Sequence, residues 1–352
     1  MAGAGGSGGG ASPGSGGSAP TDAADSGGGT GGAAIDATAQ GDAGAGVVDA
    51  APADSGTVSA DKLTCTPGTD GDGKHTLTAG DPPEWTLKAG VTPGKLTATA
   101  SFASKMFGQH FPYRVYTSAN YVKGRPAVFM FFGDGPSTYL GSFHAATVLD
   151  NLTAAGDIPP AVVLFIDPPS DGDRVQTYDP PSPKYGDFLF QEFLPAVIAP
   201  AYSVSQDPDA WATGGYSASG GADFTVLWNH PDRVHKFIGA NTSFGATIYY
   251  NHAGMYVMNA GTDHWIWADE IMKAPMHDLR ISLVTSTNDL ADARGKWIDI
   301  NTAVANALAA KGDSWRLMIG SGPHSPPSDS PRDFPEALRW IWRGCHFAVP
   351  AQ

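Results

Sequence analysis

One six-residue stretch, Gly215-Tyr216-Ser217-Ala218-Ser219-Gly220, joins an apolar run that is typical of a buried strand to a run with the pattern of a helix. Small residues on both sides of Ser217 permit a sharp, strained turn that lifts the serine hydroxyl clear of the backbone. The usual form of this turn is G-x-S-x-G, and here Ser219 replaces the second glycine. The stretch therefore predicts a strand, a tight turn and a helix, with a serine exposed at the tip.

Two serines in this turn compete for its tip. Gly215 precedes Ser217 by two residues, at the position where a sharp turn leaves little room for a side chain, so we expect Ser217 there. Reading the motif from Ser217 to Gly221 instead would place Ser219 at the tip. Two other interpretations stay open at this point: a Gly/Ser-rich turn without a chemical role, and a helix N-terminus that binds phosphate.

From residue 106 onward, short apolar runs alternate with runs of helical pattern. This alternation is typical of βαβ units and predicts an α/β protein with a mostly parallel, doubly wound sheet and helices on both faces. Ligands bind such sheets at the carboxyl ends of the strands. The expected strands are Tyr113–Thr117, Ala127–Phe132, Ala161–Ile166, Ala212–Gly214, Lys236–Gly239, Ile281–Thr285 and Arg316–Ile319. The expected helices are Phe143–Ala155, Tyr185–Ile198, Gly220–Asn229, Lys296–Lys311 and Phe334–Trp342.

The first part of the chain has a different composition. Residues 1–61 are nearly all Gly, Ala, Ser and Asp, which offer too little apolar surface to offset the entropy of ordering a backbone. We therefore expect a disordered linker over residues 1–61. Residues 62–105 are rich in Thr, Gly and Pro and predict an N-terminal extension with short strands, followed by the α/β domain over residues 106–352.

Charge and hydropathy exclude two classes of partner. The formal net charge is −14, without the clusters of Lys and Arg that phosphate neutralisation requires, so no nucleic acid is expected as a partner. No run reaches the roughly 18 to 20 consecutive apolar residues of a transmembrane segment, and the sequence carries no export signal of its own. A long Gly/Ser/Asp-rich tether is nevertheless typical of surface-attached bacterial proteins. We expect an extracellular, cell-surface or periplasmic location.

The chain has two cysteines, Cys65 and Cys345, near the two ends of the expected folded part. In an oxidising compartment a disulfide between them would stabilise the fold by on the order of 3 to 5 kcal/mol in the chain-entropy model. Two unrelated buried thiols are an equally good interpretation, because the sequence does not reveal whether the Cβ atoms meet.

Two later strands are followed by side chains that could work with Ser217. Asp289 and Asp292 come after the strand at Ile281–Thr285, and Asp289 is favoured because it lies nearer the strand end. A carboxylate there could accept the Nδ1 proton of a histidine. His324 follows the last expected strand, on a loop where imidazole can act as base and then as acid. Any one of these residues alone is more often an ordinary turn or surface residue, but the order Ser, Asp, His, each after its own strand, predicts a catalytic triad.

A serine that attacks a carbonyl also needs backbone donors for the oxyanion. The N–H of Ala218, directly after Ser217, is the first expected donor. The second comes from the loop after an earlier strand, here the one that ends at Phe132. Pro136 has no N–H to give, so we expect Gly135 to supply it.

With these residues in place, the chain resembles the enterochelin esterase-like and esterase D-like family of α/β-hydrolases, a group that also includes feruloyl and acetyl-xylan esterases. The resemblance runs from roughly Gly73 to Trp342. It is strongest at Phe224–Trp228 and Pro231-Asp232, which follow Ser217 at the distance found in relatives of enterochelin esterase and so favour Ser217 as the nucleophile. Further similar stretches are Thr147–Leu152, Phe165–Pro168, Asn288–Leu290 and Pro335–Trp340.

The resemblance implies an α/β-hydrolase fold and a serine carboxylic-ester hydrolase in which Ser217 attacks, Asp289 orients and His324 transfers the proton. It implies no metal and no organic cofactor, and an ester substrate that is small or borne on a polymer: a siderophore ester, an acylated polysaccharide or a polyester. Two alternatives remain. One is an acyltransferase of the same superfamily, and the other is a non-catalytic surface protein with this fold, for which Ser219 in the usual glycine position would be an early sign of decay.

Overall fold

The computed structural model describes residues 61–169, 174–244, 266–292, 295–325 and 328–348. The linker expected at the start of the chain lies almost wholly outside these residues, so it stays a prediction.

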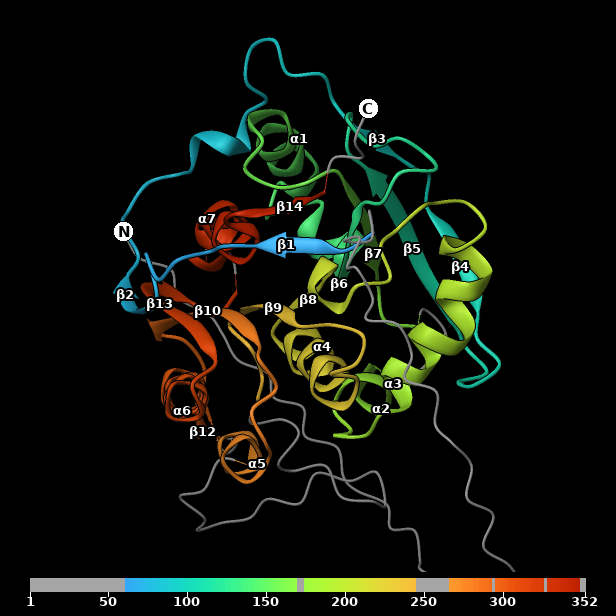
Figure 1. Ribbon diagram of the computed structural model, residues 1–352. Coiled ribbons are helices and arrows are strands. Elements are labelled where there is room, and N and C mark those ends of the chain that lie inside the picture. Colours follow the sequence, from blue (N-terminus) through green and yellow to red (C-terminus); the bar gives the residue numbers. More distant parts are fainter. Residues whose placement is uncertain (1–60, 170–173, 245–265, 293–294, 326–327, 349–352) are drawn as a thin grey trace, which may run out of the picture. The chain divides into compact units, whose positions relative to one another are not determined.

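A sheet of ten strands organises the described part of the chain (Figure 1). In sheet order the strands are β2 (Gly73–Thr76), β13 (Ser314–Pro323), β10 (Arg280–Asn288), β9 (Lys236–Ala240), β8 (Trp211–Tyr216), β6 (Val128–Gly133), β7 (Ala161–Ile166), β5 (His110–Thr117) and β3 (Lys95–Leu96), with β4 (Ala100–Ala103) also paired to β5. The strands from β2 to β7 pair in parallel, and β5, β3 and β4 are antiparallel additions at one edge. The mostly parallel sheet predicted from the sequence is confirmed.

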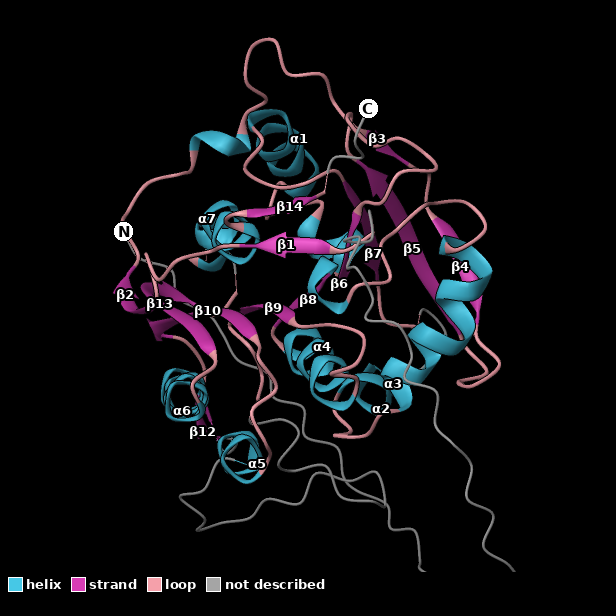
Figure 2. Cartoon of the chain, viewed as in Figure 1, coloured by secondary structure: helices cyan, strands magenta, loops and turns pink. Residues whose placement is uncertain are grey.

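Helices cover both faces of this sheet. They are α1 (Ala145–Ala155), α2 (Arg174–Tyr178), α3 (Lys184–Asp187), α4 (Ala218–Asn229), α5 (Ile266–Lys273), α6 (Trp297–Lys311) and α7 (Ser330–Trp342), with a π-helical continuation of α3, η3 (Phe188–Ile198). Figures 1 and 2 show α1 and α7 on one face and α4 and α6 on the other. This is the doubly wound arrangement that the alternating pattern predicts, and a sheet covered in this way buries its central strands on both sides.

The central strands are apolar along their whole length for this reason. Every residue of β6 and of β7 is buried. Phe129, Phe131 and Phe132 of β6 are at most 1% exposed. On one face, α7 adds Trp340 and Trp342, which are also at most 1% exposed. A rigid core therefore supports the loops at the strand ends.

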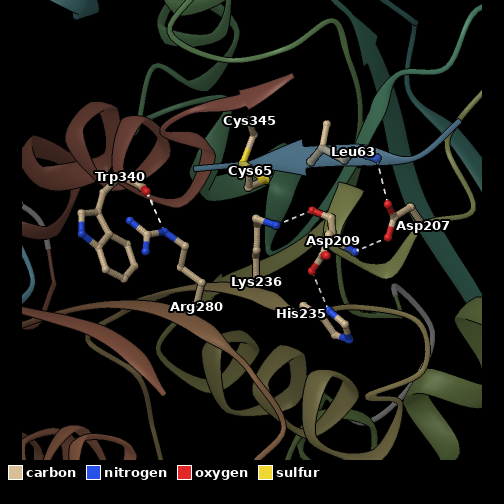
Figure 3. Close-up of a disulfide and its surroundings, with 9 residues drawn as sticks. All are labelled: Leu63, Cys65, Asp207, Asp209, His235, Lys236, Arg280, Trp340 and Cys345. Carbon is tan, nitrogen blue, oxygen red and sulfur yellow. Dashed lines mark hydrogen bonds and ion pairs between the residues drawn. A yellow bond between two sulfur atoms is a disulfide. The ribbon is translucent and has the colours of Figure 1, made fainter. Parts of the chain in front are cut away.

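A disulfide joins the beginning and the end of the described chain, near the amino ends of the parallel strands (Figure 3). Strand β1 (Leu63–Cys65) pairs antiparallel with β14 (Cys345–Phe347), which places Cys65 directly opposite Cys345. The two residues form a disulfide across a sequence separation of 280. Of the two interpretations that the sequence leaves open, the structure has the disulfide. The Leu63 N–H also donates to Asp207 Oδ2 at 2.8 Å.

Charged side chains, of which Lys236 and Arg280 are buried, lie beside this disulfide (Figure 3). His235 Nδ1 is 2.7 Å from Asp209 Oδ1, and the Lys236 ammonium donates to the Asp209 carbonyl. Arg280 donates from Nε to the Trp340 carbonyl at 2.9 Å. Lys236 and Arg280 are the first residues of β9 and β10, so this group lies at the amino ends of parallel strands. The carboxyl ends, where the sequence places the functional residues, are therefore separate from it.

None of the helices in the described residues has the length and apolar character that crossing a membrane requires.

Candidate active site

Ser217 lies between the last residue of β8 and the first residue of α4, in the unit that the sequence predicts. Its backbone has φ 56° and ψ −121°, a strained conformation for a residue with a side chain. Gly215 is required for this turn, because a Cβ at that position would lie 2.4 Å from the backbone nitrogen of Gly220. The turn therefore presents the Ser217 hydroxyl at the carboxyl edge of the sheet.

Ser219, the departure from the usual motif, is fully buried and so is not available as a nucleophile. Its hydroxyl accepts a hydrogen bond from the Tyr216 N–H at 2.9 Å and donates one to the Tyr216 carbonyl at 2.8 Å. Room for this side chain comes from Gly133 at the end of β6, where a Cβ would lie 2.7 Å from Ser219 Cβ. Ser219 therefore closes the turn with two additional hydrogen bonds.

Ser217, His324 and Asp289 meet at this edge of the sheet. Ser217 Oγ lies 2.8 Å from His324 Nε2, and His324 Nδ1 lies 2.6 Å from Asp289 Oδ1. The side chain of Asp289 is 1% exposed and that of His324 is 10% exposed, so little water reaches the contact between them. The structure brings together the three side chains that their order in the sequence singles out.

Neighbouring strands place the carboxylate beside the imidazole. Asp289 directly follows β10 and His324 directly follows β13, and these two strands are parallel partners in the sheet. The Asn288 amide donates to the Ser321 carbonyl at 2.8 Å and ties the two strand ends together. Two residues that leave adjacent parallel strands at the same edge therefore come into contact without a long loop.

Of the two aspartates considered, Asp289 faces the histidine. Its carboxylate also accepts hydrogen bonds from the Leu290 N–H at 2.7 Å and from the Thr285 hydroxyl at 3.2 Å. These donors fix the plane of the carboxylate. Asp292 lies in the short strand β11 (Ala291–Asp292), which pairs with β12 (Gly295–Lys296), and its side chain is exposed.

The loop that carries His324 is held by residues outside the predicted triad. The Tyr216 hydroxyl donates to the His324 carbonyl, and the Asn241 amide donates to the same oxygen at 3.4 Å. Asp329 Oδ2 accepts the N–H groups of Ser321 and Gly322, each at 2.6 Å. Burial, followed by the nearby Asp289, raises the pKa of Tyr216 to about 12, so its hydroxyl remains a donor at neutral pH.

The two expected oxyanion donors begin helical turns at the ends of adjacent strands. Ala218 is the first residue of α4, and Gly135 is the first residue of a π-helical turn, η2 (Gly135–Tyr139), after β6. The first N–H groups of a helical segment have no acceptor within it and are free to face a ligand. Strands β6 and β8 are hydrogen-bonded neighbours. Gly135 also lies close against β7, since a Cβ there would be 2.5 Å from Phe165 Cα.

Charged groups surround the end of β6. Asp134 adopts a left-handed conformation with φ 54° and is paired with both terminal nitrogens of Arg174, at 2.5 and 2.6 Å. Asp223 of α4 is fully buried, and its carboxyl group accepts a hydrogen bond from the Gly133 N–H at 2.8 Å. Burial raises the pKa of Asp223 well above its usual value, because an apolar surrounding disfavours the charged carboxylate. The ion pair and the buried acid together fix the segment that carries Gly135.

Ser217 has a further side-chain contact that no sequence motif predicts. Ser243 Oγ lies 3.2 Å from Ser217 Oγ, and Trp297 Nε1 lies 3.3 Å from Ser243 Oγ. Trp297 also packs edge-on against the His324 ring, with ring centroids 5.9 Å apart. Ser243 follows β9 after a short turn, and no glycine pattern or spacing marks it.

The described residues contain no group of three or more His, Cys, Asp or Glu side chains that could hold a metal ion. Among the aromatic residues between β9 and β10, Trp267 of α5 is 4% exposed and packs edge-on against Phe224, with ring centroids 5.1 Å apart. It is a core residue. Tyr249 and Trp265 lie outside the described residues.

Comparison with solved structures identifies the fold as that of the α/β-hydrolases. The enterobactin esterase of Shigella flexneri, solved in the presence of 2,3-dihydroxy-N-benzoyl-glycine, matches with a TM-score of 0.58 and 19% identity over 74% of this chain and 62% of that chain. A ferulic acid esterase matches with a TM-score of 0.57 and 17% identity over 72% of this chain and 99% of that chain. A feruloyl esterase module from Clostridium thermocellum, in complex with sinapinate, matches with a TM-score of 0.54 and 12% identity over 79% and 98%.

These similarities concern the fold. The chain spans about three fifths of the length of the enterobactin esterase structures that it matches, 62% in the first case. No family model matches the chain, and no curated protein matches it either. The fold expected from the resemblance is confirmed: the structural neighbours are enterobactin, enterochelin and feruloyl esterases.

Proposed function

We propose that the protein is a serine carboxylic-ester hydrolase that works through an acyl-enzyme intermediate. One observation carries this proposal: Ser217 Oγ lies 2.8 Å from His324 Nε2 while His324 Nδ1 lies 2.6 Å from Asp289 Oδ1. A serine hydroxyl held against an imidazole whose other nitrogen faces a carboxylate becomes a nucleophile at neutral pH. The strained turn at Ser217 leaves its oxygen accessible from the edge of the sheet.

In the first half of the reaction, Ser217 Oγ attacks the ester carbonyl carbon while its proton passes to His324 Nε2. The negative charge that forms on the carbonyl oxygen is stabilised by the N–H groups of Ala218 and Gly135. His324 is now an imidazolium, and the adjacent Asp289 carboxylate stabilises it. His324 then gives its proton to the leaving alcohol, and the acyl group remains on Ser217.

In the second half, His324 removes a proton from a water molecule, which attacks the acyl carbon. The same backbone donors hold the second oxyanion, and the proton returns to Ser217 as the acid departs. Each step uses one of the proposed side chains or N–H groups at the carboxyl edge of the sheet. No metal or organic cofactor takes part in this scheme.

The substrate is an ester whose acyl or alcohol part is bound by loops at this edge. The structural neighbours are named as enterobactin esterases and as feruloyl esterases. Siderophore esters, acylated polysaccharides and polyesters are therefore the classes to assay. The disulfide suits an oxidising location, which supports an extracellular, cell-surface or periplasmic protein.

The proposal is tested with Ser217→Ala, assayed on a small chromogenic ester and with a fluorophosphonate probe that reacts with activated serines. We expect wild type to hydrolyse the ester and to be labelled, and Ser217→Ala to lose both while keeping its thermal transition. Ser219→Ala is the matched control, because its hydroxyl bonds only to the Tyr216 backbone in the described residues. We expect the Ser219→Ala variant to be labelled by the fluorophosphonate probe.

Three results would contradict the proposal in different ways. A wild-type protein that neither hydrolyses any ester in a panel nor reacts with the probe is a non-catalytic protein with this fold. Activity retained by Ser217→Ala would exclude this serine as the nucleophile. Formation of a new ester when a sugar or glycol acceptor is present, at the expense of free acid, would identify an acyltransferase instead.

A further inference from the structure

We infer that Ser243 is a second catalytic hydroxyl that holds the Ser217 oxygen and donates to it during attack, with Trp297 as the positioning residue behind it. This role rests on the proposed function. Ser243 Oγ contacts the reacting atom itself, at 3.2 Å from Ser217 Oγ, and it is in turn 3.3 Å from the indole nitrogen of Trp297. Trp297, Ser243 and Ser217 thus form one line, a chain of hydrogen-bond contacts that leads into the predicted triad.

The direction of every hydrogen bond in this line follows from its two ends. An ionised carboxylate only accepts, so His324 Nδ1 carries its proton toward Asp289 and Nε2 is an acceptor. Ser217 must therefore give its single proton to His324. At the other end, an indole N–H only donates, so Ser243 accepts from Trp297. The remaining proton in the line, that of Ser243, is then directed to Ser217.

This polarity prepares Ser217 for reaction. Because Ser243 donates to Ser217, the Ser217 hydroxyl does not donate to Ser243 and keeps its proton directed to His324. As the new bond between Ser217 Oγ and the carbonyl carbon forms, the Ser217 proton moves to His324 Nε2 and the carbonyl π pair moves onto its oxygen. Ser243 keeps its own proton throughout and donates to Oγ while negative charge builds there. Hydrogen bonds to a charged acceptor are the stronger kind.

The backbone fixes Ser243 in this position. Its N–H donates to the Ser217 carbonyl at 2.9 Å, so the two serines are linked through main chain as well as side chain. The Asn301 amide of α6 donates to the Thr242 carbonyl at 3.0 Å and ties the turn to the helix that carries Trp297. Ser243 is 3% exposed and Trp297 is 1% exposed. Water therefore does not compete for the hydrogen bonds between them.

The test compares Ser243→Ala and Trp297→Phe with wild type in kcat, KM and the rate of labelling by the fluorophosphonate probe. Loss of one donor to a developing charge lowers a rate by roughly 10- to 100-fold. We expect Ser243→Ala to lower kcat and the labelling rate by this factor with KM unchanged, and Ser243→Thr, which keeps a hydroxyl, to restore most of the loss. Trp297→Phe keeps the ring against His324 and lowers the same rates less.

Two substitutions elsewhere serve as matched controls. The hydroxyl of Ser118 accepts the Ala161 N–H at 2.9 Å at the amino end of β7, and the indole of Trp342 faces Met130 Sδ at 3.4 Å. Ser118→Ala and Trp342→Phe remove the same chemical groups from buried positions away from the site. They lower thermal stability and leave kcat and the labelling rate unchanged.

The double variant and the pH profile distinguish a catalytic role from a structural one. If Trp297 acts through Ser243, Ser243→Ala combined with Trp297→Phe is no slower than Ser243→Ala alone. The plateau of the pH–rate profile falls in Ser243→Ala, while the shape of the profile stays that of wild type. Wild-type rates in Ser243→Ala overturn the role of Ser243 and leave the proposed function standing if Ser217→Ala is inactive. Additive losses in the double variant overturn the role of Trp297.

Discussion

The disulfide between Cys65 and Cys345 gives a quantitative prediction for the stability of the folded part. Replacing both cysteines by serine removes a cross-link between residues 280 apart, within the pairing of β1 with β14. In the chain-entropy model, a closed loop of this length stabilises the native state by about 5.6 kcal/mol, because the cross-link removes conformations mainly from the unfolded chain.

This free energy converts into a shift of the melting temperature. The part of the chain between residues 61 and 348 unfolds with an entropy of roughly 2.1 cal/mol/K per residue, or about 0.6 kcal/mol/K in total. A loss of about 5.6 kcal/mol therefore lowers Tm by about 9 °C. The substitution lies at the amino ends of the strands, so turnover of a chromogenic ester at 25 °C is expected to stay at the wild-type value.

Thermal unfolding followed by circular dichroism checks this prediction, with thiol counting under denaturing conditions to establish that the wild type is oxidised. Reduced wild type should melt together with the Cys65→Ser, Cys345→Ser double variant, because both lack the same cross-link. A Tm within a degree or so of oxidised wild type in both samples would refute the reasoning. It would mean that the contacts of β1, such as Leu63 N–H with Asp207, hold the two ends without the disulfide.

Two further predictions concern single side chains. Asp289→Asn lowers kcat by roughly 10⁴-fold with little change in KM, because an amide in place of the carboxylate stabilises the wrong tautomer of His324; Asp292→Asn, assayed in parallel, keeps wild-type rates. The mutual hydrogen bond between His235 and Asp209 raises the pKa of His235 and lowers that of Asp209. The pair therefore stabilises the fold between about pH 4 and 6.5, and this contribution is lost as pH rises through the raised pKa of His235 or falls through the lowered pKa of Asp209. His235→Gln, compared with wild type by urea unfolding across this range, should show its largest deficit between these limits; a deficit that does not change with pH would contradict the assignment.

The fold was accessible from the sequence where local pattern and burial agree. The runs that became β6 and β7 are apolar at every position because both of their faces are covered, and their predicted bounds are within a residue of those observed. The last helix begins at Ser330 rather than at the predicted Phe334, because Pro331 fits the first turn of a helix and does not mark its boundary. Strand β2 pairs with β13 through backbone hydrogen bonds, and three of its four residues are exposed. It therefore has no apolar pattern from which it could be predicted.

Part of the candidate site could also be predicted from the sequence. Ser217, Asp289 and His324 could be singled out because each directly follows a strand, and strand ends meet at one edge of a parallel sheet. Ser243 could not, since it is an ordinary serine in a turn after β9 and its importance arises only from the position of Trp297, which is 54 residues away in sequence. Hydrogen bonds between distant turns leave no periodic signal in a sequence.

The replacement of glycine by Ser219 illustrates why a local departure from a motif is a weak guide to loss of function. In the turn itself, a side chain at this position would be expected to crowd the strand beside it. That strand has Gly133 at the point of contact, 86 positions earlier in the chain, and the absence of a side chain there leaves room for Ser219. The Ser219 hydroxyl then binds both backbone groups of Tyr216, whose own hydroxyl holds the His324 loop. Gly133 makes room for the Ser219 side chain, and three hydrogen bonds connect Ser219 through Tyr216 to the His324 loop. The substitution therefore favours a working turn over an abandoned one.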